Sequence, residues 1–159
     1  MLDDATRNSL IAQYEDGYRA VADALDGITD DELDAREASG EWSPRQVVHH
    51  LADSEMRSAL RLRELLVADR PTITAYDQEE YARVLHYDRP IAPSLAAFRA
   101  ARDCTVPLLH RMTPEDWSRE GAHVESGSYR VEDWLRIYAA HAHDHADQIR
   151  RARAAASLV

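Results

Sequence analysis

Several residue types that often mark a functional class are rare or missing in this chain. Its 159 residues include a single cysteine, Cys104, and no lysine, so all 19 basic residues are arginines. One cysteine excludes an intramolecular disulfide and favours a reducing, cytoplasmic location. The sequence around Cys104 predicts that it packs as a small, buried residue of a helix, outside any functional site.

Signals for strands and for membrane segments are also scarce. Only five glycines are available for hairpin turns, and no run of β-branched residues alternates with polar ones. No window approaches the roughly 20 consecutive apolar residues that cross a bilayer. The amino terminus is acidic, unlike that of a secretory signal. These absences predict a helical cytoplasmic protein without a membrane partner.

Charge and length narrow the class further. The formal net charge is -10 at pH 7, and the arginines are spread along the chain. Because no basic patch can follow a phosphate backbone, we expect no nucleic-acid partner. With 45% apolar residues, a chain of this length can bury a core as one domain, which we predict to span residues 1–159.

Apolar residues at helical spacing predict an all-α fold, a four-helix bundle with short extra helices in its connectors. The second long helix is the best marked, because Ser43 can cap it, Pro44 suits its first position and Gln46 completes a capping box. Trp42 and Trp117 are expected to anchor helix starts in the core. The expected long helices span about 5–25, 44–69, 94–112 and 131–156, with short ones starting at Thr29, spanning 77–85 and within 113–117.

Two histidines in the last helix lie four residues apart and therefore share one face. These are His141 and His145. They continue a stripe begun by Trp134 and Tyr138, which we expect to turn inward. His143 points almost opposite and is expected to face solvent. Two inward imidazoles at this spacing can be joined by a single divalent metal.

A third histidine comes from the second long helix. Helical phase places His50 beside the apolar stripe of that helix and His49 on the far side, so we choose His50. The connector after this helix is long enough to cross the bundle, which allows the two histidine-bearing helices to be neighbours. Ser54 and Ser58 are small positions on the same stripe, and they suit either a pocket above the metal or a filled core.

Three neutral imidazoles from two helices would leave a coordination position of the metal open to water or substrate, as in a catalytic metal site. Zinc, nickel and iron all suit such ligands. The alternative is that the histidines are solvated or hydrogen-bond within the core. Asp53 and Asp144 are candidates to orient an imidazole or take a proton, with a solvated surface carboxylate as the alternative for each; Glu55 and Asp147 rank below them.

Three stretches of the chain stand out together: GEWSPRQVVHHLADSE, TPEDW and YRVEDWLRIYAAHAHDHADQI. They resemble the DinB/YfiT-like superfamily, and its YfiT-like branch most closely. The resemblance covers nearly the whole chain and implies a four-helix bundle with a histidine triad. Its helix-two ligand matches His50, and its helix-four pair matches His141 and His145.

The resemblance also implies a function. Members of this family bind a divalent ion such as nickel or zinc, and many form homodimers. Some are described as hydrolases, and others transfer low-molecular-weight thiols such as bacillithiol or mycothiol. This chain has Asp144 where relatives often carry another histidine, and the added negative charge disfavours an anionic substrate unless arginines compensate.

Three functions follow as hypotheses. The first is a metal-dependent enzyme that transfers a low-molecular-weight thiol to an electrophilic small molecule. The second is a hydrolase in which the ion lowers the pKa of bound water from about 15.7 towards about 7. The third, of another class, is a non-catalytic bundle that metal stabilises and that dimerises. For either enzyme, metal affinity is expected to weaken as pH falls through about 6.5.

Overall fold

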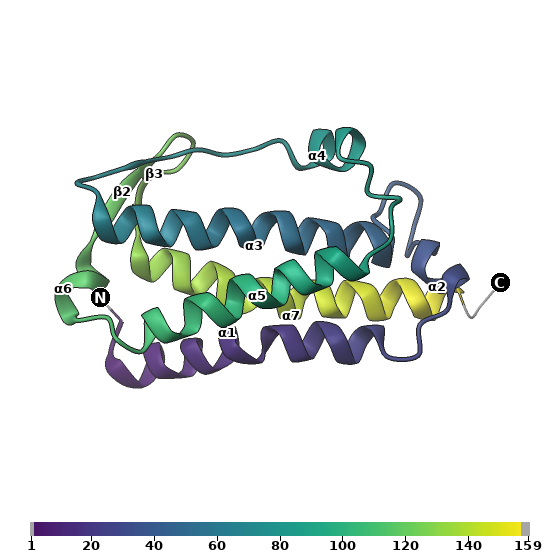
Figure 1. Ribbon diagram of the computed structural model, residues 1–159, viewed down its shortest axis with the longest axis horizontal. Helices are drawn as coiled ribbons and strands as arrows, with labels where there is room; N and C mark the ends of the chain where they lie inside the picture. Colours follow the sequence, from purple (N-terminus) through teal and green to yellow (C-terminus); the bar gives the residue numbers. More distant parts are fainter. Residues whose placement is uncertain (1, 157–159) are drawn as a thin grey trace.

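Four long helices form a bundle in the computed structural model, which describes residues 2–156 (Figure 1). The first and last of them run in one direction, and the other two run in the opposite direction. All four were predicted, with bounds that differ by at most a few residues. They are α1 (Asp4–Leu25), α3 (Pro44–Val67), α5 (Ala92–Leu109) and α7 (Val131–Ala156).

Local capping explains where α3 and the short helices begin. The Ser43 hydroxyl accepts a hydrogen bond from the Gln46 backbone N–H, and the Gln46 side chain accepts one from the Ser43 backbone N–H. This reciprocal box satisfies two N–H groups that would otherwise lack partners. Similar boxes start the helices α2 (Asp30–Asp34), at Thr29 and Glu32, and α6 (Pro114–Ser118), at Thr113 and Asp116.

A long connector carries the chain from the end of α3 back to the opposite end of the bundle. It contains the short helix α4 (Gln78–Val84), whose amino terminus is capped by Asp77. Because the connector crosses the length of the molecule, α3 and α5 run parallel to each other (Figure 1). The crossover lets α3 pack against α7, so the two helices that carry the candidate ligands are neighbours.

The predicted four-helix bundle is confirmed, and it carries a small sheet that the sequence did not predict. The sheet joins β1 (Thr72–Ile73), β2 (Glu120–His123) and β3 (Gly127–Arg130), with β1 parallel to β2 and β2 antiparallel to β3. Gly127 turns the hairpin with a φ of 80°. Strands of two to four residues are too short to show alternation, and their pairing depends on segments that the fold brings together.

A buried ion pair at the centre of the bundle was not predicted. Arg102, in α5, donates to the Glu55 carboxylate of α3 at 2.9 Å, to the Tyr14 carbonyl of α1 at 2.5 Å and to the Tyr138 carbonyl of α7 at 2.9 Å. Both charged side chains are fully buried. A Cβ at Gly17 would overlap the guanidinium, so the absence of a side chain there makes room for it. This one cluster connects all four long helices.

None of the helices within residues 2–156 is both long enough and apolar enough to cross a bilayer.

Candidate metal centre

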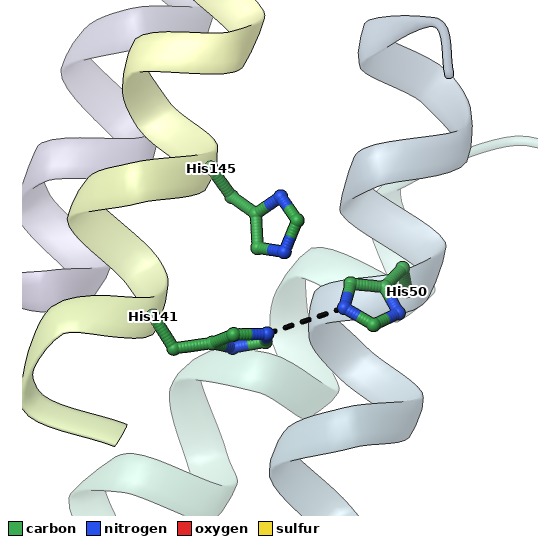
Figure 2. A group of neighbouring side chains, drawn as sticks. All are labelled: His50, His141 and His145. Atoms are coloured by element: carbon green, nitrogen blue, oxygen red, sulfur yellow. Dashed lines mark hydrogen bonds between the residues drawn. The ribbon is translucent and has the colours of Figure 1, made fainter. Parts of the chain in front are cut away.

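Three histidines converge between α3 and α7. His50 projects from α3, while His141 and His145 project from successive turns of α7 into the same space (Figure 2). The Nε2 atoms of His50 and His141 are 3.2 Å apart. One nitrogen from each ring lies within 4.8 Å of the nitrogens of the other two. The structure therefore brings together all three residues that the sequence singled out as candidate ligands.

The neighbouring histidines make other contacts. His49 is fully buried on another side of α3, where its ring nitrogens hydrogen-bond to the Ser94 hydroxyl at 2.7 Å and the Arg89 carbonyl at 2.9 Å. His143, expected to face solvent, is half-buried, and its Nε2 lies 3.0 Å from the Gln13 carbonyl of α1. That expectation was wrong because α1 packs along the face of α7 opposite the cluster.

Burial determines the protonation of the cluster. Desolvation lowers the pKa of His50 to about 3 and that of His141 to about 2. The pKa of His145 is also lowered, mainly by burial, although its hydrogen bond to Gln148 and the charge of Asp144 oppose the shift. Neutral imidazoles are the form that binds a metal. The lowered pKa values therefore keep the three rings in this neutral form near pH 7.

Hydrogen bonding leaves one nitrogen of His145 free to bind. Its Nδ1 lies 2.8 Å from the Gln148 Oε1, so this contact assigns the proton to Nδ1 and the lone pair to Nε2. The His141 Nδ1 is buried without a hydrogen-bond partner among the described residues. The Trp42 and His50 rings pack in a T-shaped arrangement, with 4.9 Å between their centroids and 60° between their planes.

The three imidazoles fit a divalent ion. Nitrogens that each lie about 2.0–2.1 Å from one tetrahedral ion are about 3.4 Å apart, close to the 3.2 Å between His50 and His141. Three neutral nitrogen donors suit zinc, nickel or iron, and they leave at least one coordination position for another ligand.

The candidate carboxylates do not hydrogen-bond to the cluster. Asp53 accepts a hydrogen bond of 2.6 Å from the Tyr87 hydroxyl, and Asp144 is exposed on α7. Glu55 belongs to the buried ion pair with Arg102, and Asp147 pairs with Arg150 on the surface. None of these carboxylates hydrogen-bonds to His50, His141 or His145 among the described residues.

Cys104 lies outside the cluster, as expected, but the prediction that it is buried was wrong. It is exposed on α5. The neighbouring positions Arg102 and Thr105 take the inward direction of this helical turn. The apolar residues around Cys104 suggested that it faces the core. An arginine is not expected at a buried position, so the sequence did not show that Arg102 faces the core instead.

A cavity of about 300 Å³ opens beside His145. It is formed by the segment before α3, the start of α4 and the middle of α7. We call it the His145 cavity, and its lining residues are Gly40, Glu41, Trp42, Gln78, Glu79, His145 and Gln148.

The structure decides between the two alternatives for Ser54 and Ser58, a pocket above the metal or a filled core. Ser54 and Ser58 are buried, and the Ser58 hydroxyl donates to Glu55, so these small positions belong to the filled core and not to the cavity wall. Trp42 packs against the core before α3, as expected, but it is only half-buried and also lines the cavity. Helical spacing alone could have found Gln148, which follows His145 by three residues, but no sequence pattern places Glu79 beside it.

Comparison with known proteins gives three likenesses. A family model described as the DinB superfamily matches residues 13–149. A protein of Oceanobacillus iheyensis named "putative metal-dependent hydrolase" is 36% identical over 138 residues, which cover 87% of this chain and 80% of the relative. A Bacillus mycoides protein with the same description is 31% identical over 139 residues, with 87% and 80% covered.

A solved structure matches the fold. YfiT from Bacillus subtilis, described as "a probable metal-dependent hydrolase with an unusual four-helix bundle topology", superimposes with a TM-score of 0.88 and 28% identity. The match covers 94% of this chain and 86% of that one. The names of all three proteins refer to a metal.

Proposed function

This chain belongs to the DinB superfamily, and we propose that it is a divalent-metal-dependent enzyme in which His50, His141 and His145 hold the ion. The observation that carries the proposal is the convergence of three imidazoles, one buried and two half-buried, with one nitrogen of each within 4.8 Å of the others. Their lowered pKa values keep the rings neutral near pH 7 and so favour metal binding.

A divalent ion held by these residues lowers the pKa of a water or thiol that it binds, and so supplies a nucleophile at neutral pH. The protein contributes orientation and access. Gln148 fixes the ring of His145 through a hydrogen bond of 2.8 Å. The His145 cavity brings one of the three imidazoles to a depression that is open to solvent.

Transfer of a low-molecular-weight thiol to an electrophilic substrate is our first candidate reaction. No carboxylate hydrogen-bonds to the three imidazoles among the described residues, so the site offers no contacting base. A thiol, with an ordinary pKa near 8.5, needs less help to ionise than water, whose pKa is about 15.7. In this reaction the sulfur bonds to an electrophilic carbon, the leaving group departs with its electron pair, and the thiol proton passes to solvent.

Hydrolysis is the second candidate. It is supported by the descriptions of the relatives from Oceanobacillus iheyensis and Bacillus mycoides as hydrolases. We further propose a single domain, a cytoplasmic location and a homodimeric assembly. If metal binds but no reaction is found, the results would support the third hypothesis, a metal-stabilised dimer without catalytic activity.

The test begins with elemental analysis of tag-free protein, because a histidine tag would itself bind metal. We expect close to one equivalent of zinc, nickel or iron. The loaded protein is then assayed with chlorodinitrobenzene, with and without added thiol, and with nitrophenyl acetate. Thiol-dependent loss of the first compound supports transfer, and thiol-independent cleavage of the second supports hydrolysis. Absence of metal after reconstitution with each ion would contradict the proposal.

The metal-free protein is expected to lose stability as pH falls from about 6.5 to about 4. In this window the unfolded chain protonates its histidines, whereas the folded cluster, with the pKa of His50 lowered to about 3 and that of His141 to about 2, does not. Unfolding therefore takes up protons. The free energy of unfolding should fall by up to about 1.4 kcal/mol per pH unit for each such histidine.

Urea unfolding across this pH range, in the presence of a chelator, measures the effect. The variant His50→Ala should show a shallower pH dependence than the unmodified protein. His143→Ala, which changes a histidine outside the cluster, should keep the original slope. Equal slopes for all three proteins would contradict the lowered pKa values.

A further inference from the structure

The His145 cavity has an acidic opening. Two of its lining residues, Glu41 and Glu79, are exposed carboxylates that come from different parts of the chain. Glu79 lies in the first turn of α4, and one of its oxygens accepts a hydrogen bond of 3.3 Å from the Trp42 indole. The Glu41 carboxylate has no hydrogen bond or ion pair among the described residues. Both charges thus remain available at the opening.

The nearby arginines do not neutralise these carboxylates. Arg151, whose charge lies close enough to sense Glu41, makes its ion pair with Glu37 at 2.8 Å. Arg36 donates to the backbone carbonyl of Glu41 and not to its side chain. Asp144, exposed beside His145, adds another negative charge to this region. The opening is therefore negative on balance.

The other walls of the cavity suit an organic cation. The half-buried Trp42 indole supplies an aromatic surface, and aromatic rings attract ammonium and guanidinium groups. Gln78 and Gln148 offer amide groups without charge. The His145 cavity has a volume of about 300 Å³ and is largely open to solvent.

From these contacts we propose that the His145 cavity selects substrates that carry an ammonium group, which Glu41, Glu79 and Trp42 bind at the opening while the reacting end of the molecule lies at the histidine cluster. The assignment of the occupant as a substrate rests on the proposed function. The selectivity itself depends on the cavity alone, so the two can be tested separately. Because the carboxylates are exposed and screened, we expect a preference of about tenfold.

The test compares two probes of similar size and opposite charge, phenethylamine and 3-phenylpropionate. Binding is followed by tryptophan fluorescence and calorimetry. Trp42 is the accessible reporter, because Trp117 and Trp134 are buried at 3% and 0% exposure. We expect phenethylamine to bind about tenfold more tightly than 3-phenylpropionate. The double variant Glu41→Gln, Glu79→Gln should abolish this preference.

The matched control is Glu80→Gln, in the same turn of α4. The Glu80 carboxylate pairs with Arg83 and does not line the cavity. This variant should keep the preference for the amine. Equal binding of the two probes, or tighter binding of the carboxylate, would overturn the proposal. The proposal would also be overturned if the Glu41→Gln, Glu79→Gln variant bound less metal but kept the preference for the amine. The two carboxylates would then help to bind the metal ion instead of the substrate.

The metal content of every sample is measured in parallel. A preference for the amine in protein that cannot bind metal would support the cavity proposal and contradict the metal-dependent enzyme. Bound metal without any preference would support the enzyme and contradict the cavity proposal. The two failures are thus distinguishable.

Discussion

Replacing His145 with alanine is expected to weaken binding of the divalent ion at least about 100-fold, because one of three donors is lost. The fold should persist, since His145 is half-buried at the edge of the cavity and not part of the central ion-pair cluster. Elemental analysis and calorimetric titration measure the metal, and circular dichroism measures the helix content of the same samples.

The matched control is His143→Ala, two residues away on the same helix. Its imidazole contacts the Gln13 carbonyl of α1, so this variant should bind metal as the unmodified protein does. Metal binding that survives in the His145 variant would exclude that residue as a ligand. Loss of metal in both variants would point to general damage to α7 instead of loss of a donor.

Replacing Glu55 with alanine is expected to lower the free energy of unfolding by about 3–5 kcal/mol. The change leaves the Arg102 guanidinium charged and fully buried without its carboxylate partner. It also removes the acceptor for the hydroxyls of Tyr14, at 2.5 Å, and Ser58, at 3.0 Å. For a chain of this size the melting temperature should fall on the order of 10 °C, as measured by calorimetry.

The control is Glu64→Ala, which removes a carboxylate from the exposed face of the same helix and should change the stability by less than about 0.5 kcal/mol. A second variant, Glu55→Leu with Arg102→Leu, removes both charges together. It should recover much of the loss, because no unpaired charge remains in the core. A stable Glu55→Ala protein would show that Arg102 finds another partner or reaches solvent.

The candidate ligands were predictable because helical phase is a local property. The four-residue spacing of His141 and His145 fixes their common face, and the stripe around His50 separates it from His49. Glu55 shows the limit of this reasoning. It lies on α3 five residues after His50, yet its role depends on an arginine 47 residues further along the chain. Periodicity contains no information about such a partner.

The sequence by itself determined the four long helices, their capping residues and the inward direction of the three histidines, because hydrogen bonding and side-chain direction within a helix depend on residues at most four apart. The tertiary structure alone decided that α3 lies beside α7, that Arg102 joins all four helices, that short segments pair as a sheet, and that Trp42 and Glu79 reach the cavity at His145. These contacts join residues far apart in the chain, so they depend on packing geometry that short-range patterns do not encode.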